Sequence, residues 1–339
     1  MQFSVRSQLL KPLPIFGRLP FDSYARMMKY VSSTRHLRFR GNDYHNAERI
    51  NVSVCKTKLP PASSQQLKDI RVEYDLLFDT ELRFPGSKAI TATYPDGSEY
   101  TMTLSEKRAL WSRELTPSRL QLCANTYLLA LEFAFPSVSF GDQQSRVGRT
   151  VLRGGKALFS MLPESLNFLR EQNVHPLTDL TPDQTWKWIS AQNGVFSGYS
   201  DTPASRAFGY FTRLYNTAFR NDELSDLVWA LASIEALLVD AGRSSVGQLK
   251  SKLACLFDEH EGRKFILDQV ERTYGFRSKM IHGNRQVLSV LRRDEDEPDG
   301  RFSEEYDSAR YAVGMAFILI QRLIRENRNS FSFHMVLDK

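Results

Sequence analysis

Cysteine is scarce in this 339-residue chain, which contains three, at Cys55, Cys123 and Cys255. The three are far apart and odd in number, and none stands at the Cys/His spacing of a zinc site. These absences argue against a disulfide scaffold and a zinc module. We expect reduced core thiols in a cytoplasmic protein, and neither a metal nor another cofactor.

Long apolar runs are also missing. No segment approaches the ~18 apolar residues of a membrane span, and arginines bracket the longest run, near Tyr311–Ile320. Residues 1–20 lack the continuous apolar core and small-residue cleavage site of a signal peptide. A hydrophobic content of 42% and a charged content of 25% are those of a globular protein long enough for two or three domains, without a membrane partner.

Charge is unevenly distributed along the chain. Residues 1–200 carry 25 of the 45 Lys and Arg side chains and 18 of the 39 Asp and Glu side chains, whereas residues 201–339 carry 20 and 21. The basic surplus therefore lies in the first part, which suits the binding of a polyanion there and other work in the near-neutral second part.

The hydrophobic period changes along the chain and predicts an α+β protein. A β-rich N-terminal domain is expected over residues 1–110, where alternating apolar residues predict strands at 35–40, 50–54, 70–78, 90–94 and 100–104. Pro95-Asp-Gly-Ser98 is a hairpin turn between the last two strands. A helical connecting region follows over 111–202, where Thr116-Pro117 and Thr181-Pro182 each predict a helix start.

Residues 203–330 have the period of an all-α bundle. Apolar stripes predict helices over 223–240, 246–258 and 262–284, and an acidic loop at 294–300 separates them from a fourth helix. Ser303 is expected to cap that fourth helix, with Glu304 and Glu305 in its first turn. Its core stripe comprises Ala309, Val313, Ala316, Phe317, Ile320 and Ile324.

An arginine followed five positions later by a histidine occurs three times, as Arg40…His45, Arg170…His175 and Arg277…His282. The first pair is expected at a strand end and the second at a helix end before Pro176. In both places we expect a chance occurrence of the spacing among surface residues. The third lies within an amphipathic helix. Five positions correspond to ~7.5 Å of rise and ~140° of rotation, so Arg277 must use its length to approach His282.

The predicted helix over 262–284 has an apolar and a polar side. Its core side comprises Ile266, Val270, Thr273 and Met280, and its polar stripe comprises Glu271, Tyr274, Ser278, His282 and Arg285. Arg277 borders the polar stripe, and Ser278 is stacked one turn before His282. Glu235 interrupts the apolar stripe of the helix over 223–240, either as a rim residue or as a buried partner of Arg277.

Three segments together carry a family resemblance: Leu231-Ala-Ser-Ile-Glu-Ala-Leu-Leu238, Leu249-Lys-Ser-Lys-Leu253 and Tyr274-Gly-Phe-Arg-Ser-Lys-Met-Ile-His-Gly283. In order and spacing they resemble the Apea-like branch of the HEPN superfamily, over about residues 205–330. The resemblance implies an all-α bundle that dimerises through its Arg-His helices. It also implies a metal-independent endoribonuclease of a prokaryotic antiphage, abortive-infection or toxin system. Ser278 departs from the Asn, Asp or His that often follows the arginine.

In that reading His282 transfers protons, Arg277 stabilises phosphate charge, and Ser278 completes the catalytic set, with Tyr274 and Glu235 in support. The expected partners are RNA, a second copy or a higher oligomer, and a phage-derived trigger or regulator. RNA could also be guided by Arg38, Arg40 and Arg285, with His36 and the segment Arg146–Lys156. The alternative interpretation, without a role in RNA binding, is that the basic N-terminal residues form a solvated edge strand and a loose loop.

The rival interpretation is a catalytically inactive HEPN dimerisation or binding module for RNA, a nucleotide or a protein. In it, His282 merely ends the helix and Arg277 pairs with Glu235.

Overall fold

The computed structural model describes residues 2–10, 35–41, 48–55, 72–82, 90–103, 105–106, 126, 129–136, 139–147, 150–152, 161–192, 202–215, 223–240, 245–284 and 301–333. Their contacts divide the chain into two units, one built from strands and one from helices. Each unit is described by itself.

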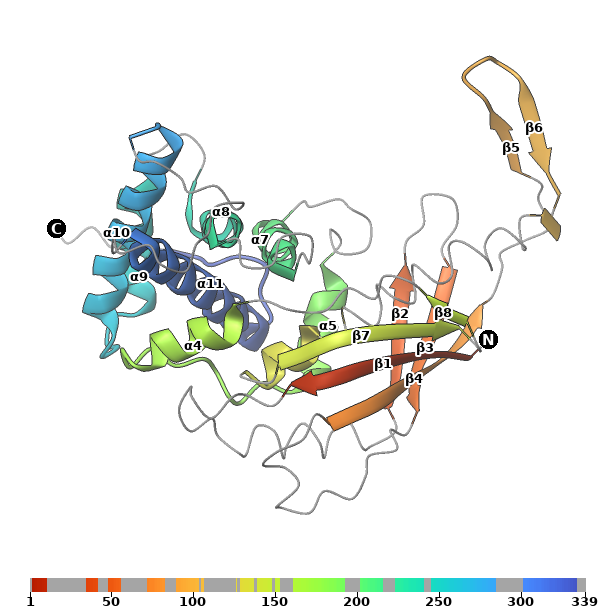
Figure 1. Ribbon diagram of the computed structural model, residues 1–339, viewed down its shortest axis with the longest axis horizontal. Coiled ribbons are helices and arrows are strands. Elements are labelled where there is room, and N and C mark those ends of the chain that lie inside the picture. The colour runs from red at the N-terminus through yellow and green to blue at the C-terminus, as the bar shows by residue number, and fades with distance from the viewer. Residues whose placement is uncertain are drawn as a thin grey trace. The chain divides into compact units, whose positions relative to one another are not determined.

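The first unit contains a six-stranded sheet in the order β2-β3-β4-β1-β7-β8 (Figure 1). β2–β3, β3–β4, β1–β4 and β7–β8 are antiparallel neighbours. The strands are β1 (Gln2–Leu10), β2 (Arg35–Gly41), β3 (Glu48–Cys55), β4 (Val72–Leu82), β7 (Ser139–Val147) and β8 (Thr150–Leu152).

A two-stranded ribbon, β5 (Ile90–Thr93) and β6 (Glu99–Met102), is separate from the larger sheet. The turn expected at Pro95-Asp-Gly-Ser98 joins its strands. Gly97 adopts a φ of 83° and donates its N–H to the Tyr94 carbonyl at 2.9 Å. Asp96 accepts from the N–H of Ser98 at 2.9 Å, so both residues act as the turn chemistry requires.

The strands β2 to β6 overlap the five predicted strands with shifted bounds, whereas β1, β7 and β8 were not predicted. Part of the expected loose loop at Arg146–Lys156 pairs instead, since Arg146 in β7 is opposite Val151 in β8. The strand β7 has few apolar residues, so the alternation that predicts a strand is missing from its sequence. The helix start at Thr116-Pro117 and the acidic loop at 294–300 lie outside the described residues.

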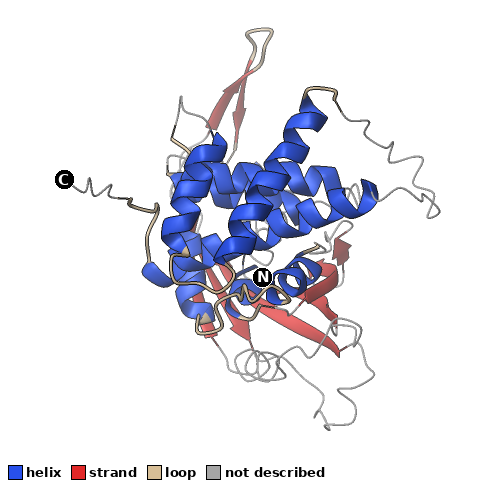
Figure 2. Cartoon of the chain, turned by 90° about the vertical axis from the view of Figure 1, so that its left-hand side faces the viewer, coloured by secondary structure: helices blue, strands red, loops and turns tan. Residues whose placement is uncertain are grey.

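The second unit is a helical domain (Figure 2). It includes α4 and α5, which lie in the region expected to connect two domains. Its helices are α4 (Leu162–Arg170), α5 (Pro182–Ala191), α7 (Pro203–Phe211), the short 3-10 helix η4 (Thr212–Tyr215), α8 (Glu223–Leu238), α9 (Ser245–Leu256), α10 (Arg263–Ile281) and α11 (Arg301–Glu326).

The centre of this domain is α11. It packs against α4, α5, α7, α8 and α10, and every side chain from Tyr311 to Gln321 is buried. The six residues of its predicted core stripe are all buried, as expected. The helix begins at Arg301 rather than after a Ser303 cap, so the expectation for its start was wrong. Glu304 still lies in the first turn of the helix, where the macrodipole favours an acidic side chain.

Helix starts at Thr-Pro pairs follow the expected chemistry. The Thr181 hydroxyl accepts from the N–H of Gln184 at 3.2 Å, and Pro182 is the first residue of α5. The same arrangement begins α7, where Thr202 accepts from the N–H of Ser205 at 3.1 Å. In both helices the cap satisfies a backbone donor that has no carbonyl partner within the helix.

A buried glutamine joins α11 to two other segments. The amide nitrogen of Gln321 donates to the carbonyls of Phe133 at 2.7 Å and Leu177 at 3.0 Å. Its amide oxygen accepts from the Leu177 N–H at 2.8 Å. Phe133 also stacks on Phe317 with a centroid separation of 4.5 Å. The segment 129–136, the loop after α4 and α11 therefore share one satisfied polar centre within an aromatic core.

One ionisable group is enclosed in this core. Glu132 is 2% exposed, and its carboxyl accepts from the Tyr215 hydroxyl at 2.7 Å. Burial raises the pKa of Glu132 to about 8, against a smaller opposing effect of the Tyr215 hydrogen bond. The carboxyl is thus held in its neutral form at mildly acidic pH, because its desolvated charge would be costly.

We predict that Glu132 makes this domain less stable as the pH rises. The pKa is raised from 4.5 to about 8 on folding, so the stabilising contribution is fully present below pH 4.5 and is lost as the pH approaches 8. The free energy of unfolding of Glu132→Gln, which never ionises, should rise relative to that of the wild type by a few kcal/mol between about pH 5 and about pH 8. Urea unfolding at the two pH values measures this difference. Glu171→Gln, at an exposed position, is the control. An advantage of Glu132→Gln that is equal at both pH values would contradict this assignment.

Candidate functional site

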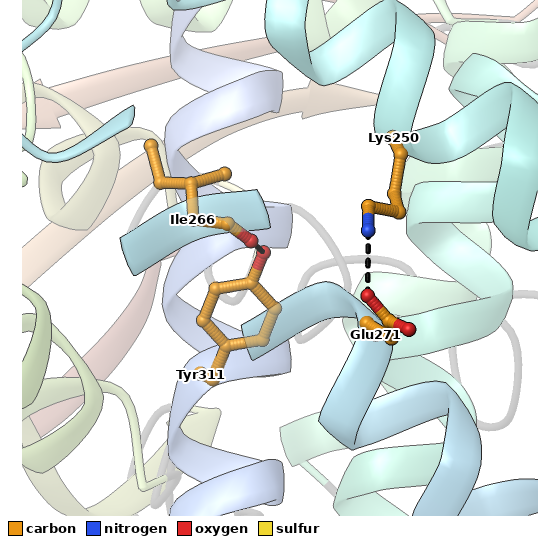
Figure 3. A network of polar contacts seen from close by, with 4 residues as sticks. All are labelled: Lys250, Ile266, Glu271 and Tyr311. Carbon is orange, nitrogen blue, oxygen red and sulfur yellow. Dashed lines mark hydrogen bonds and ion pairs between the residues drawn. The ribbon is translucent and has the colours of Figure 1, made fainter. Parts of the chain in front are cut away.

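The helix α10 carries the Arg-His pair and is fixed from two sides. From α11, the buried Tyr311 hydroxyl donates to the Ile266 carbonyl at 2.8 Å (Figure 3). From α9, Lys250 forms an ion pair with Glu271 at 2.5 Å, also drawn in Figure 3. The second contact is solvent-exposed and contributes little, so the buried hydrogen bond and apolar packing hold α10 in place.

Arg277, Glu235 and Tyr274 form one cluster between α10 and α8. Glu235 accepts from the Tyr274 hydroxyl at 3.0 Å, and the same carboxylate oxygen lies 3.5 Å from an Nη atom of Arg277. The guanidinium carbon of Arg277 is also 5.9 Å from the centroid of the Tyr274 ring. Glu235 is therefore paired with Arg277, as one of the two sequence interpretations expects, but its side chain is 25% exposed rather than buried.

Tyr274 is a hydrogen-bond donor in this cluster. Its side chain is buried, and burial followed by the adjacent Glu235 carboxylate raises its pKa above the ordinary value. A phenol in this state keeps its proton at neutral pH. It therefore orients Glu235 and cannot serve as a base or nucleophile.

The ion pair with Glu235 uses only part of the hydrogen-bonding capacity of the Arg277 guanidinium. Its side chain is 32% exposed, and its Nε atom is buried without a hydrogen-bond partner. An arginine has five N–H donors in a fixed fork, and one ion pair at 3.5 Å leaves donors for another anion.

His282 is held at the end of α10 by a Schellman motif. It is the C-cap residue, and its N–H donates to the Ser278 carbonyl at 3.0 Å. Gly283 follows with a φ of 71°, and its N–H donates to Met280 at 3.2 Å. The N–H of Asn284 donates to the Lys279 carbonyl at 2.9 Å. These two bonds define the motif, so the backbone of His282 is fixed while its side chain is exposed.

The polar stripe predicted for α10 is only partly present. Ser278 and His282 are exposed on one side, as expected, but Tyr274 is buried and belongs to the cluster with Glu235. The tyrosine ring packs inward because its apolar body gains from burial while its hydroxyl finds a carboxylate. Met280 is half-buried rather than a core residue, and Phe276 is buried instead. Arg285 lies outside the described residues.

The other Arg-His pairs do not join this site. Arg170 is the last residue of α4, and His175 is exposed beyond it, as the surface interpretation expects. His45 lies outside the described residues. Arg38 and Arg40 occupy alternate positions of β2, opposite Asn51 and Arg49, in the strand unit.

Comparison of the chain with protein families, with curated proteins and with solved structures finds no significant match. Within the described ranges, no three His, Cys, Asp or Glu side chains are grouped so that they could hold a metal ion. None of the described helices is long and apolar enough to cross a membrane. Cys255 is exposed on α9, so the expectation of a core thiol was wrong at this position.

Sequence reasoning missed the role of Gly283. A glycine directly after the last residue of a predicted helix is the usual sign of a left-handed C-terminal cap, and that sign was present in His282-Gly283. It also missed Lys250 and Tyr311, which contact α10 from two other helices. Those contacts depend on helix packing and have no local signal.

We predict that the Tyr274–Glu235 hydrogen bond contributes measurably to stability. A double-mutant cycle of Tyr274→Phe and Glu235→Ala in urea unfolding should give a coupling energy of about 1 kcal/mol, since a buried donor is bonded to a partly exposed carboxylate. Tyr274→Phe combined with Glu259→Ala, at an exposed glutamate in the loop after α9, should be additive. Additivity within about 0.3 kcal/mol in the first cycle would show that the two side chains do not interact in solution.

Proposed function

We propose that the chain is a metal-independent endoribonuclease whose site is formed by Arg277 and His282. The observation that carries this proposal is the end of α10, where an exposed histidine on a fixed backbone follows a half-exposed arginine by five positions. A cation for phosphate and an imidazole that can exchange a proton are the two elements that RNA transesterification needs. The resemblance of residues 205–330 to Apea-like HEPN proteins supports the same choice.

The reaction forms a bond between the ribose 2′-oxygen and phosphorus and breaks the bond from phosphorus to the 5′-oxygen. His282 takes the proton of the 2′-hydroxyl, and a second imidazole gives a proton to the leaving 5′-oxygen. Arg277 binds the nonbridging oxygens, where negative charge accumulates in the transition state. The products are a 2′,3′-cyclic phosphate and a 5′-hydroxyl.

A second copy of the chain would supply the second imidazole. The end of α10 carries a single histidine, His282. It lies ~7.5 Å from Arg277 along the helix axis, because the two are five positions apart. Ile281, next to His282, is 56% exposed and gives this helix end an apolar contact surface. Homodimerisation through α10 is therefore part of the proposal, with Ser278 beside the phosphate.

A second candidate is a binding module without catalysis. The observation in its favour is the Arg277–Glu235 ion pair, because a paired arginine is what a structural role requires. The remaining N–H groups of Arg277 and the exposure of His282 favour the nuclease.

The proposal of a nuclease includes a function in antiphage or toxin-type defence, with a trigger that controls the site.

We predict that His282→Ala abolishes RNA cleavage while the fold is retained. The wild type, in EDTA, should cut single-stranded RNA to 2′,3′-cyclic phosphate products and leave DNA intact, and the variant should lose at least about 100-fold in rate. His175→Ala is the matched control, because His175 is also an exposed histidine just beyond a helix. Normal cleavage by the folded His282→Ala protein would contradict the assignment of the site to His282, and RNA binding without cleavage by the wild type would favour the binding module.

We predict that the cap at Gly283 positions His282. A Cβ at position 283 meets nothing within 4 Å, so Gly283→Ala costs only the strain of a φ of 71°, about 1 kcal/mol. The strain should loosen the helix end and lower kcat severalfold with little change in thermal stability. Gly283→Asn, which tolerates this φ, should retain most activity.

Gly275→Ala is the control for the effect of an added methyl group. Its Cβ also meets nothing within 4 Å, in an ordinary helical conformation of α10. It should stabilise the helix by up to ~1 kcal/mol and leave cleavage unchanged. Equal activity of Gly283→Ala and Gly283→Asn would show that the cap does not position the histidine.

A further inference from the structure

An aromatic and cationic cluster lies on α7, η4 and α8, apart from the Arg-His pair. The rings of Tyr210 and Trp229 are stacked, with centroids 6.0 Å apart and an interplanar angle of 24°. The guanidinium carbon of Arg213 lies 5.7 Å from the centroid of the Trp229 ring. Unlike the stacked rings of the core, this pair reaches the surface, since Tyr210 is 37% exposed and Trp229 is half-buried.

Basic side chains flank the exposed tyrosine. Arg206, Tyr210 and Arg213 follow one another at steps of four and three positions, so they lie on one side of α7 and its η4 continuation, and all three are exposed. Among the described residues, neither arginine forms an ion pair with a carboxylate. The positive charge of these two exposed side chains is therefore not neutralised by an ion pair and is available to a ligand.

The composition of the cluster selects the kind of ligand. A flat ring that extends the Tyr210–Trp229 stack, carrying anionic groups within reach of Arg206 and Arg213, satisfies both features. Nucleotides of a single strand have this chemistry, because each base offers a π-face and each linkage a phosphate. An acidic peptide would satisfy the arginines but leave the exposed tyrosine ring without a stacking partner.

We infer that Arg206, Tyr210, Arg213 and Trp229 form a binding site for single-stranded RNA, at which a base stacks on the Tyr210–Trp229 pair and the arginines contact flanking phosphates. The choice of RNA rests on the proposed function, while the stacking and charge arguments stand without it. The cluster contacts no reacting atom, and its role is to hold the strand.

Helix α8 connects this cluster to the Arg-His site. Trp229 and Glu235 are six positions apart on it, which corresponds to ~9 Å of rise. Glu235 in turn bonds Tyr274 and Arg277 of α10. The two sites therefore share a helix, and because six positions also correspond to ~240° of rotation, Trp229 and Glu235 lie on different sides of α8.

Binding of a fluorescently labelled oligouridylate tests the inference in the full-length chain. All proteins carry His282→Ala, so that cleavage does not consume the probe. Tyr210→Ala should weaken binding by about 5- to 100-fold, the range for loss of one stacked base, whereas Tyr210→Phe should bind normally. Arg213→Gln should weaken binding and lower the slope of log K against log salt concentration by about 0.7.

Matched controls are Tyr94→Ala, at an exposed tyrosine of the β5–β6 ribbon, and Lys187→Gln, at an exposed lysine of α5. Thermal melting confirms that each variant is folded. Unchanged affinity in folded Tyr210→Ala and Arg213→Gln overturns the inference. So does a change of oligomeric state in Tyr210→Ala with unchanged RNA affinity, which would identify the cluster as a contact between copies.

The outcomes separate this inference from the proposed function. If the wild type does not cleave RNA but binding depends on Tyr210, the nuclease proposal fails and the RNA site stands. If the wild type cleaves RNA through His282 and Tyr210→Ala leaves the RNA affinity unchanged, the nuclease proposal is supported and the RNA site is wrong.

Discussion

The helical domain depends on the complete burial of α11 between Tyr311 and Gln321. A helix without a solvent-exposed side in its centre must find internal partners for every polar side chain there. Gln321 finds three backbone groups in the segment 129–136 and the loop after α4, and Tyr311 finds the Ile266 carbonyl. These hydrogen bonds select one arrangement of the neighbouring helices, whereas apolar contacts alone would tolerate several.

The position of the candidate site follows from this constraint. Tyr311 and the buried residues Ile266 and Val270 fix one side of α10 against the core, which leaves Arg277 directed toward α8 and Glu235. Beyond them the helix ends at Ile281, and the Schellman motif places His282 outside the packed region. The arginine is therefore held by the tertiary structure, and the histidine is held mainly by its own backbone.

The helices α8, α9 and α10 were predictable close to their observed bounds because each has an amphipathic period and lies in a bundle of local connections. The exposure of Ser278 and His282 followed from the same period. The inward turn of Tyr274 did not, because it depends on a carboxylate from another helix. The strand β1 and the Tyr210–Trp229 stack were missed for a related reason: each depends on a partner from another element further along the chain.

The ion pair between Glu235 and Arg277 has one further consequence. Glu235 is an internal competitor for any anion that Arg277 binds. A phosphate that binds the remaining N–H groups shares the guanidinium with Glu235 and weakens their ion pair, so ligand affinity and the attachment of α10 to α8 are opposed. Tyr274 moderates this opposition, because it continues to donate to Glu235 when the arginine is engaged elsewhere. The carboxylate is then never left without a donor, and α10 keeps one polar link to α8 in either state.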